Sequence, residues 1–285
     1  MEKVGKDVVR FQVGDRVTAD ANLPCGTCYY CIRGEVQFCE NNRAYGQSLN
    51  GGFAQLVAVD ESLVYKVPDS VSLRAASMTE LVGCVYNCME RCNFKYGSEV
   101  LILGGGASGN LIAQMVKSSN AATVVVDCVA GKLERLKPVG VKTILADKDD
   151  PEVHEAVLKE QYPHGFDYII DTTANPKLIS RSLYLLKRGG TFVNYGFQNN
   201  VKVAEQVQID MTLFVTRQLS YLGTTFQHFK FPQTLKAMEE KRVDPELAIS
   251  EIRPLDDFFE CMDKVLYDPE TVKIVLEPNG SSEGM

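Results

Sequence analysis

Apolar residues follow different patterns in the two parts of this chain. In residues 1–72, short apolar runs alternate with turn residues such as Gly and Asp. Such runs are typical of antiparallel strands. We expect short strands in residues 8–17, 51–59 and 63–67, then a loop and a short helix over residues 73–80. The chain therefore begins with a β-rich region.

From residue 99 onward, apolar strands alternate with helix-length segments. The pattern predicts strands at residues 99–103, 122–126, 166–171, 191–196 and 219–223. It predicts helices at residues 110–117, 151–161, 176–187 and 231–241, and a last strand at 272–276. Alternation of this kind indicates an α/β fold with a doubly wound parallel sheet.

Length, charge and cysteine content narrow the class of protein. A chain of 285 residues is long enough for two domains. Its net charge of −7 gives no electrostatic footprint for nucleic acid or an anionic membrane. We find neither an apolar run of membrane-spanning length nor a signal-peptide core. Nine cysteines fit a reducing compartment, so we expect a cytoplasmic protein.

Four of the cysteines form the densest chemical motif of the chain. Cys25, Cys28, Cys31 and Cys39 have the spacing C-x2-C-x2-C-x7-C. Two disulfides or four unrelated buried thiols are the alternatives, but disulfides need an oxidising compartment. Thiolates at this spacing can converge on one tetrahedral zinc ion, and a site with no open ligand position is structural. We predict a structural zinc site.

A second set of cysteines, Cys84, Cys88 and Cys92, lies at intervals of four residues. On a helix these thiols share one face. Thiols stacked on one straight helix cannot surround an ion, so we interpret them as small packing residues rather than as a second metal site.

The first strand of the alternating region runs into a glycine-rich turn, and a helix follows. Gly104, Gly106 and Gly109 form G-x-G-x-x-G, with Ser108 inside the motif. The three glycines would permit a tight turn, close approach of a pyrophosphate, and packing of helix on strand. Phosphates would then meet the positive end of the helix. A glycine turn in some other α/β unit is the alternative reading.

An acidic residue follows the next strand at the position that the dinucleotide fingerprint requires. Asp127 would accept hydrogen bonds from the adenosine ribose and repel a 2′-phosphate, which favours NAD. Lys132 could reach such a phosphate, so NADP is also possible. Loops at the carboxyl ends of the strands, around Thr172, Tyr195 and Thr224, should border the nicotinamide. The full set of coenzyme-binding candidates is Gly104, Gly106, Ser108, Gly109, Asp127, Lys132, Tyr195, Gly196, Thr224 and Thr225.

These motifs, in this order, resemble the zinc-dependent medium-chain alcohol and polyol dehydrogenases, particularly the sorbitol, xylitol and arabinitol branch. The likeness runs from about Val4 to Pro278. It rests on the four-cysteine lobe, Gly51-Gly52-Phe53-Ala54, Pro68-Asp69, Glu80 with Cys84, the glycine fingerprint, and Arg188-Gly189-Gly190. The resemblance implies a GroES-like β-barrel catalytic domain at residues 1–83 and 229–285. It implies a Rossmann domain at residues 84–228.

The sequence departs from the family pattern at several points. Family members carry a zinc-binding Cys and a Gly-His-Glu segment before the region where this chain begins, so the resemblance implies an N-terminally truncated catalytic domain. The three histidines do not match that motif; they are His154, His164 and His228. Glu80 matches an active-site glutamate that ligates the catalytic zinc or hydrogen-bonds its water. Ala174 replaces a common glycine.

By resemblance, we expect a homo-oligomeric enzyme, a dimer or tetramer, that oxidises a secondary hydroxyl of a sugar alcohol with NAD(P). A catalytic zinc would lower the pKa of the substrate hydroxyl, and the alkoxide would release hydride to the coenzyme. With Glu80 as the single remaining ligand, we expect feeble activity of the chain as printed. The alternatives are a non-catalytic dinucleotide-binding protein and a zinc-independent reductase of the quinone oxidoreductase type, which generally lacks the four-cysteine lobe. The acidic charge argues against a nucleic-acid zinc ribbon.

Overall fold

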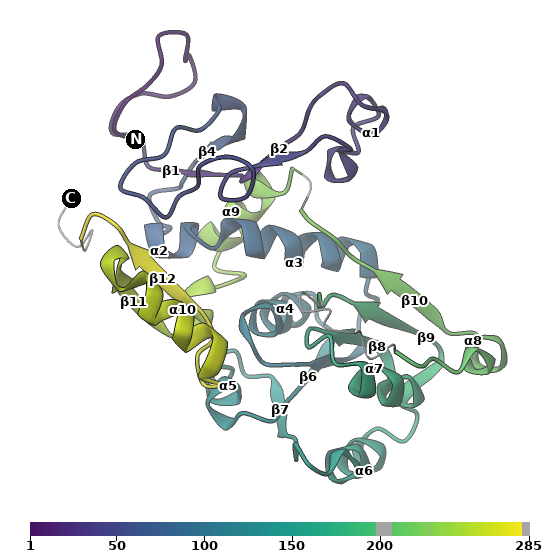
Figure 1. The fold of residues 1–285 in the computed structure, drawn as a ribbon. Helices are drawn as coiled ribbons and strands as arrows, with labels where there is room; N and C mark the ends of the chain where they lie inside the picture. Colours follow the sequence, from purple (N-terminus) through teal and green to yellow (C-terminus); the bar gives the residue numbers. More distant parts are fainter. Residues whose placement is uncertain (198–206, 228, 281–285) are drawn as a thin grey trace. The chain divides into compact units, whose positions relative to one another are not determined.

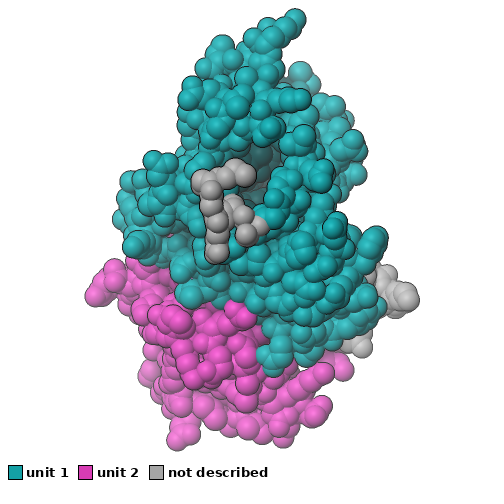
Figure 2. All heavy atoms as spheres, turned by 90° about the vertical axis from the view of Figure 1, so that its left-hand side faces the viewer, with its two compact units in different colours: residues 1–86, 226–285 teal, residues 87–225 magenta. Residues whose placement is uncertain are grey.

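A computed structural model describes residues 1–197, 207–227 and 229–280, and the chain divides into two compact units. Unit 1 comprises residues 1–86 and 226–285, and unit 2 comprises residues 87–225 (Figure 2). The predicted boundaries were 83/84 and 228/229. The first boundary of the structure falls inside helix α3 (Thr79–Cys92), which carries the chain from one unit into the other.

Unit 2 is built on a six-stranded sheet in which every pairing is parallel (Figure 1). The strand order is β10-β9-β8-β5-β6-β7, so the sheet grows outward in both directions from its centre, β5 and β8. The strands are β5 (Glu99–Leu103), β6 (Ala122–Asp127), β7 (Lys142–Leu145), β8 (Phe166–Asp171), β9 (Leu186–Asn194) and β10 (Ser220–Gly223). This order is that of a doubly wound dinucleotide-binding sheet, as predicted.

Three helices of unit 2 begin where a side chain caps the first turn. Asp150 accepts a hydrogen bond from the backbone N–H of Glu152, and Pro151 occupies the first turn. Asn175 and Pro176 do the same for the next helix. The helices are α4 (Ala107–Ser118), α5 (Ala130–Glu134), α6 (Pro151–Gln161), α7 (Pro176–Ser182), the 3-10 turn η3 (Leu183–Leu185) and α8 (Met211–Arg217).

The core of unit 2 lies along the central strands. Leu101, Ile169 and Phe192 are fully buried, and they belong to one apolar cluster that continues into α6 and α7. Near-continuous apolar runs are expected where a parallel strand is covered on both faces. Because burial on both faces gives these strands apolar sequences, they could be predicted from the sequence.

The prediction of a helix over residues 176–187 was too long. Helix α7 ends at Ser182, and β9 already begins at Leu186, which is buried and pairs with Phe166 of β8. The Arg188-Gly189-Gly190 motif lies within β9. It forms a bulge there, because residues 186 to 191 face residues 166 to 168. Tertiary pairing thus overrides the local helical pattern.

Unit 1 contains three small sheets among its described residues (Figure 1). Two are antiparallel: β1 (Val17–Ala19) with β4 (Val64–Lys66), and β2 (Asn22–Leu23) with β3 (Arg43–Ala44). The third joins β11 (Glu251–Pro254) and β12 (Ile274–Glu277) in parallel. The described strands of unit 1 thus form three separate two-stranded sheets.

Short helices complete unit 1. They are α1 (Tyr29–Ile32), α2 (Leu73–Ala76), α9 (Phe231–Glu239), α10 (Phe258–Tyr267), and the 3-10 turns η1 (Val36–Phe38), η2 (Glu61–Leu63), η4 (Pro245–Ala248) and η5 (Leu255–Asp257). The single helix expected over residues 73–80 is divided between α2 and the start of α3. In the part of the chain that the structure describes, no helix has the length and apolar character to cross a membrane.

Two of the predicted strands of unit 1 were wrong. Residues 8–16 contain no strand, and β1 starts only at Val17. Residues 51–59 also contain none, although their apolar pattern favoured one. Phe53 and Leu56 in this segment are 71% and 67% exposed. A strand exists only when a neighbour accepts its backbone hydrogen bonds, and among the described residues no strand pairs with this segment.

Candidate functional site

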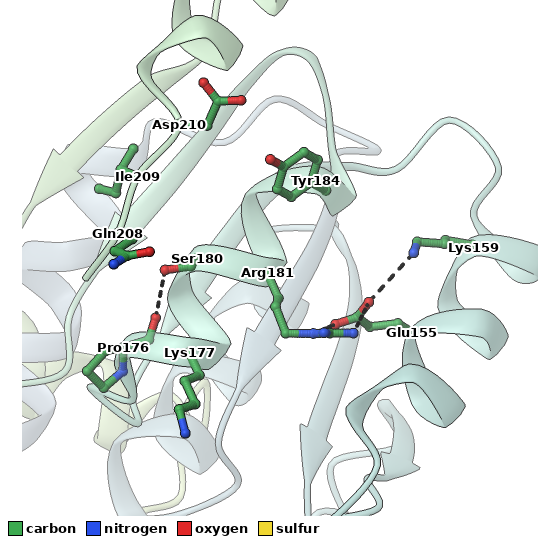
Figure 3. A pocket seen from close by; sticks show the side chains of 10 residues that line it. All are labelled: Glu155, Lys159, Pro176, Lys177, Ser180, Arg181, Tyr184, Gln208, Ile209 and Asp210. Carbon is green, nitrogen blue, oxygen red and sulfur yellow. Dashed lines mark hydrogen bonds and ion pairs between the residues drawn. The ribbon is translucent and has the colours of Figure 1, made fainter. Parts of the chain in front are cut away.

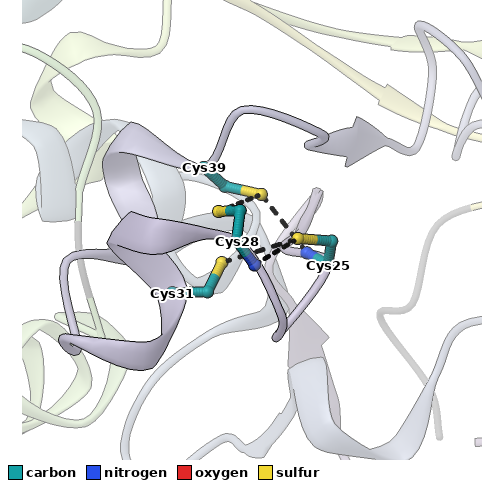
Figure 4. Close-up of side chains that lie close together, drawn as sticks. All are labelled: Cys25, Cys28, Cys31 and Cys39. Carbon is teal, nitrogen blue, oxygen red and sulfur yellow. Dashed lines mark hydrogen bonds between the residues drawn. The ribbon is translucent and has the colours of Figure 1, made fainter.

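The four predicted zinc ligands lie together in one lobe of unit 1 (Figure 4). Cys25 precedes α1, Cys28 caps it, Cys31 lies within it, and Cys39 follows η1. Their sulfur atoms all lie within 4.8 Å of one another. This is the only group of three or more candidate metal ligands in the described part of the chain.

The distances in this lobe suit zinc. The sulfurs of Cys25 and Cys31 are 3.9 Å apart, and those of Cys28 and Cys39 are 4.0 Å apart. A tetrahedral zinc ion with Zn–S bonds of about 2.3 Å places its sulfurs about 3.8 Å apart. All nine cysteines, each within the described residues, are free, so the disulfide reading is not supported. The lobe can hold a zinc ion.

Backbone amides around the lobe favour thiolates. The N–H groups of Cys28 and Cys25 point to the sulfurs of Cys25 and Cys39, at 3.4 and 3.3 Å. Hydrogen bonds from Thr27, first from its N–H and then from its hydroxyl, lower the pKa of Cys25 to about 5. The thiolate is the form that binds metal. The local fold thus prepares this sulfur for a cation.

The glycine-rich loop follows β5 at the centre of the unit 2 sheet. Gly104 has φ +100°, and Gly109 lies so close to it that an added Cβ would collide with the carbonyl oxygen of Gly104. An added Cβ at Gly106 would instead meet nothing within 4 Å. No contact within the protein therefore requires a glycine at position 106. An approaching phosphate, however, requires this open space. Ser108 lies half-buried in the first turn of α4.

Asp127 ends β6 beside this loop. One carboxylate oxygen accepts a hydrogen bond from the N–H of Gly105 at 2.7 Å, and the other accepts from the N–H of Val129 at 2.8 Å. Asp127 thus fixes the glycine loop while its remaining lone pairs can still accept ribose hydroxyls. Lys132 lies in α5.

The other coenzyme candidates meet at the carboxyl ends of β8, β9 and β10. The N–H groups of Tyr195 and Gly196 donate to the carbonyl oxygen of Asp171, at 3.0 and 2.8 Å. The hydroxyl of Thr224 is buried without a hydrogen-bond partner. Thr225 is exposed, and its carbonyl accepts from the side chain of Asn87 at 3.2 Å.

Asp171 is a residue that the sequence analysis did not single out. Its side chain is fully buried and accepts hydrogen bonds from the N–H and hydroxyl of Thr173 and from the N–H of Ala174. Burial raises its pKa. The carboxylate organises the loop next to the glycine turn, where the hydroxyl of Thr172 donates to the carbonyl of Leu103 at 2.8 Å. An acid at the end of an apolar strand, followed by Thr-Thr, was the available signal.

Glu80 lies in the first turn of α3, in unit 1. The Cys84 thiol donates to its carboxylate at 3.1 Å. Burial, together with the charge of Glu80, raises the pKa of Cys84, so this thiol stays protonated. Cys88 and Cys92, one and two turns further on, are buried. These contacts agree with packing cysteines.

Two polar residues near Cys84 were also missed by the sequence analysis. Asp20 and Gln227 are 7% and 4% exposed, and the side-chain amide of Gln227 donates to the Asp20 carboxylate. Burial raises the pKa of Asp20, while hydrogen bonds from Asn22 oppose this. Their contact joins positions 207 residues apart. No local pattern could reveal it.

The two histidines that the structure describes lie outside these sites. His154 is buried in α6, His164 is exposed after it, and His228 lies outside the described residues. A separate cavity of about 1230 Å³ lies in unit 2, between α6, α7 and residues 208–210 (Figure 3). Arg181 there forms an ion pair with Glu155 at 2.6 Å. None of the predicted site residues lines this cavity.

Comparisons with known proteins place both units in one family. Residues 1–69 match the family described as "Alcohol dehydrogenase GroES-like domain", and residues 107–240 match "Zinc-binding dehydrogenase". D-arabinitol dehydrogenase 1 of Uromyces fabae is 29% identical over 278 residues, covering 96% of this chain and 78% of that protein. D-altritol 5-dehydrogenase of Agrobacterium fabrum is 30% identical over 278 residues, covering 95% and 79%.

The fold agrees with these matches. A solved structure described as a zinc-binding dehydrogenase from Sinorhizobium meliloti 1021, bound to NADP, superposes with a TM-score of 0.86. It is 27% identical, and the match covers 97% of this chain and 80% of that one. A six-stranded parallel sheet, a glycine loop at its centre and a four-cysteine lobe thus occur together with whole-length similarity. The chain belongs to the zinc-binding alcohol dehydrogenase family.

Proposed function

We propose that this protein is an NAD(P)-dependent polyol dehydrogenase, which oxidises a secondary hydroxyl of a sugar alcohol to a ketose. Relatives named for arabinitol and altritol match it over nearly its whole length. The observation that carries the proposal is the open glycine loop between β5 and α4, with the Asp127 carboxylate bound to it. Such a loop binds the pyrophosphate of a dinucleotide.

On the coenzyme side, the residues of unit 2 would each make a specific contact. The N-terminus of α4 and the N–H groups of residues 106–109 would hold the pyrophosphate, with Ser108 in the same turn. Asp127 would accept the ribose hydroxyls, so we favour NAD over NADP, with Lys132 as a possible phosphate contact. Tyr195, Gly196, Thr224 and Thr225 would border the nicotinamide, which accepts the hydride when bound.

On the substrate side, Glu80 is our candidate catalytic residue. It is a half-buried carboxylate whose neighbour Cys84 donates a hydrogen bond to it. The described residues around Glu80 do not supply a third ligand atom, so they do not fit a catalytic zinc ion. We therefore derive no step through such an ion. The zinc ion that the chain does fit belongs to the four-cysteine lobe, where it would stabilise local structure.

Coenzyme binding and turnover test the proposal directly. We would titrate the purified protein with NADH and with NADPH and follow the fluorescence of the reduced nicotinamide. We would then follow reduction of NAD and NADP with D-arabinitol, xylitol, sorbitol and D-altritol. The expected result is binding of NADH and polyol-dependent appearance of NADH. The Glu80→Gln variant should bind NADH unchanged and lose turnover, because it keeps the shape of the side chain but removes its charge.

Each alternative predicts a different result. Coenzyme binding without turnover of any polyol would favour a non-catalytic dinucleotide-binding protein. Reduction of quinones in the absence of polyol oxidation would favour the quinone-type reductase. Failure to bind either reduced coenzyme would contradict the proposal as a whole.

We further propose a homo-oligomer in the cytoplasm. Strand β10 is an edge of the unit 2 sheet, and Tyr221 on it is 43% exposed. An edge strand presents unpaired backbone groups that a second copy can satisfy. The nine free thiols suit a reducing compartment. Light scattering during size-exclusion chromatography should give the mass of a dimer or tetramer. The mass of a monomer would contradict the proposed homo-oligomer.

A further inference from the structure

A nine-residue segment of unit 1, residues 51–59, has a backbone that is almost without hydrogen-bond partners. In the described part of the chain, none of its N–H groups donates a hydrogen bond. Of its carbonyl groups, only that of Gln55 has a partner among the described residues, the side-chain amide of Asn279 at 3.2 Å. The segment thus has the free hydrogen-bonding capacity of an edge strand.

The side chains of this segment are apolar and exposed. Phe53, Leu56 and Val57 all lie at the surface, and residues 51–59 contain no charged residue. A groove of about 860 Å³ runs along the segment, and Tyr45 lies on its wall. An uncharged, exposed segment with a strand pattern is a typical surface for pairing with another chain.

The contact with Asn279 determines which edge of the segment is free. In an antiparallel pair, the backbone groups of successive residues point alternately toward the partner and away from it. The carbonyl group of Gln55 points to Asn279 of the same chain. The even-numbered residues 52, 54, 56 and 58 therefore present their N–H and carbonyl groups at the opposite edge, when the segment is extended.

The order of residues makes the segment complementary to a second copy of itself. If two copies run antiparallel with Gln55 opposite Gln55, then Phe53 of each copy faces Val57 of the other. At both ends the amide of Asn50 faces the carboxylate of Asp60. Pairs of an aromatic and a β-branched residue stabilise a sheet, and no like charges meet. A segment of an unrelated protein would not require this symmetry, so the sequence favours a second copy.

We propose that residues 51–59 form an antiparallel strand pair with the same residues of a second copy of this chain. The even-numbered residues make the hydrogen bonds, and pairing straightens the bend that residues 52–55 now form. This interface lies in unit 1, whereas the β10 edge lies in unit 2, and the use of both would give a tetramer. The pairing does not depend on the dehydrogenase function proposed above.

The affinity of this pair should be modest. Nine residues of paired strand form an interface at the low end of the size of specific complexes, about 1,200 Å². We therefore expect a dissociation constant in the micromolar range. Sedimentation velocity between about 1 and 100 μM should show reversible doubling of the mass of the zinc-loaded protein.

A disulfide at the twofold position tests the register. In the pair, the two Gln55 residues lie in a non-hydrogen-bonded position with their Cα atoms about 4.5 Å apart, which permits a disulfide. Gln55→Cys in a Cys128→Ser background, treated with oxidised glutathione in the presence of zinc, should form a covalent dimer on a non-reducing gel. Gln233→Cys, at an exposed position of α9, is the matched control and should stay monomeric on that gel.

A charge-exchange experiment tests the partner of each side chain. Phe53→Glu and Val57→Lys each place a charge against an apolar residue, so each should weaken self-association at least about tenfold. In a mixture of the two variants the introduced glutamate faces the introduced lysine, so association should return. Val9→Lys, at an exposed position outside the segment, should associate as the wild type does. Zinc content and unfolding temperature confirm that each variant is folded.

The remaining outcomes overturn the proposal. They are a folded Gln55→Cys variant that gives no covalent dimer, a Val57→Lys variant that associates as tightly as the wild type, and a mixture that stays dissociated. Species of undefined, growing mass in place of a dimer would show non-specific edge aggregation and would also overturn it. NADH binding and polyol turnover, measured on the same proteins, report separately on the dehydrogenase function. Their absence would leave the strand pair unaffected.

Discussion

At the scale of single residues, the glycines of the coenzyme loop are needed for different reasons. An added Cβ at Gly109 would collide with the backbone, whereas one at Gly106 would enter empty space. Gly109 is therefore required by the fold, whereas Gly106 is required by the ligand. The same motif therefore holds two kinds of constraint, which substitutions can separate.

We predict that Gly106→Ala leaves the free energy of unfolding nearly unchanged and weakens NADH binding about tenfold or more, because the methyl group occupies the space of the phosphate. Gly109→Ala should instead lower the free energy of unfolding by several kcal/mol, roughly as overpacking does. Urea unfolding and NADH titration measure the two effects. Equal loss of stability in both variants would contradict this distinction.

Ala174 shows a different kind of constraint. It has φ 54°, in the left-handed region, where a Cβ is unfavourable by roughly 1–2 kcal/mol. Ala174→Gly should therefore raise the free energy of unfolding by roughly 0.5–1 kcal/mol, after the entropy cost of glycine. The control, Ala130→Gly at the start of α5, should be destabilising. A lower unfolding temperature of Ala174→Gly would show that no strain is present.

At the scale of elements, the lobe around α1 depends on its metal. Helix α1 has only four residues and buries none of them. An element this short is not stable by itself. Four sulfurs at tetrahedral distances supply the missing stabilisation when zinc is bound.

We predict one zinc ion per chain and its loss in Cys39→Ser, with a lower unfolding temperature, since structural zinc contributes directly to folding. Cys128→Ser, at an exposed position after β6, is the control and should retain the metal. Atomic absorption and calorimetry measure both quantities. Full zinc content in Cys39→Ser would place the ion elsewhere.

Helix α6 carries a pH-dependent contribution. His154 in this helix is 4% exposed, and burial lowers its pKa from the ordinary value of 6.5. The unfolded chain therefore binds more protons than the folded chain as the pH falls below 6.5, so the free energy of unfolding falls with it. A single group gives a slope of at most about 1.4 kcal/mol per pH unit.

Denaturant unfolding at several values between pH 5 and pH 8 tests this effect. The slope of stability against pH should be smaller in His154→Gln than in the wild type. His164→Gln, which removes an exposed histidine, should retain the wild-type slope. Identical slopes in all three proteins would assign the pH dependence to other groups.

At the scale of the whole molecule, the candidate zinc site and the candidate coenzyme site belong to different units. The four cysteines lie in unit 1, and the glycine loop with Asp127 lies in unit 2. Each unit has its own buried residues, such as Phe231 in unit 1 and Phe192 in unit 2. Ligand effects on stability should therefore differ between the units.

We predict that NADH at 100 times its dissociation constant stabilises unit 2 by about 2.7 kcal/mol. Removal of zinc by a chelator should act first on unit 1. Hydrogen exchange resolves the two, with amides of β5 reporting on unit 2 and amides of β4 on unit 1. Zinc removal that exposes β5 as much as β4 would show that the units unfold together.

Much of unit 2 was predictable because its signals are local. Residues 166–171 are a largely apolar run that follows Gly165 and ends in an acid, and α6 begins at Asp150-Pro151 as the capping pattern indicates. The start of β9 was not predictable, because the local pattern around Leu186 is helical. Leu186 belongs to a strand because it pairs with Phe166 of β8. The prediction of a strand at residues 51–59 was wrong for the opposite reason. The apolar pattern there is that of a strand, but the pattern does not supply a neighbouring strand to pair with.

The sequence by itself determined the metal lobe, the glycine turn with Asp127, and the parallel α/β order, because each depends on residues close together in the chain. The tertiary structure alone decided the contacts of Asp20 with Gln227 and the burial of Asp171. These depend on segments up to 207 residues apart. Only packing brings such segments together, and a buried polar group acquires its partners only there.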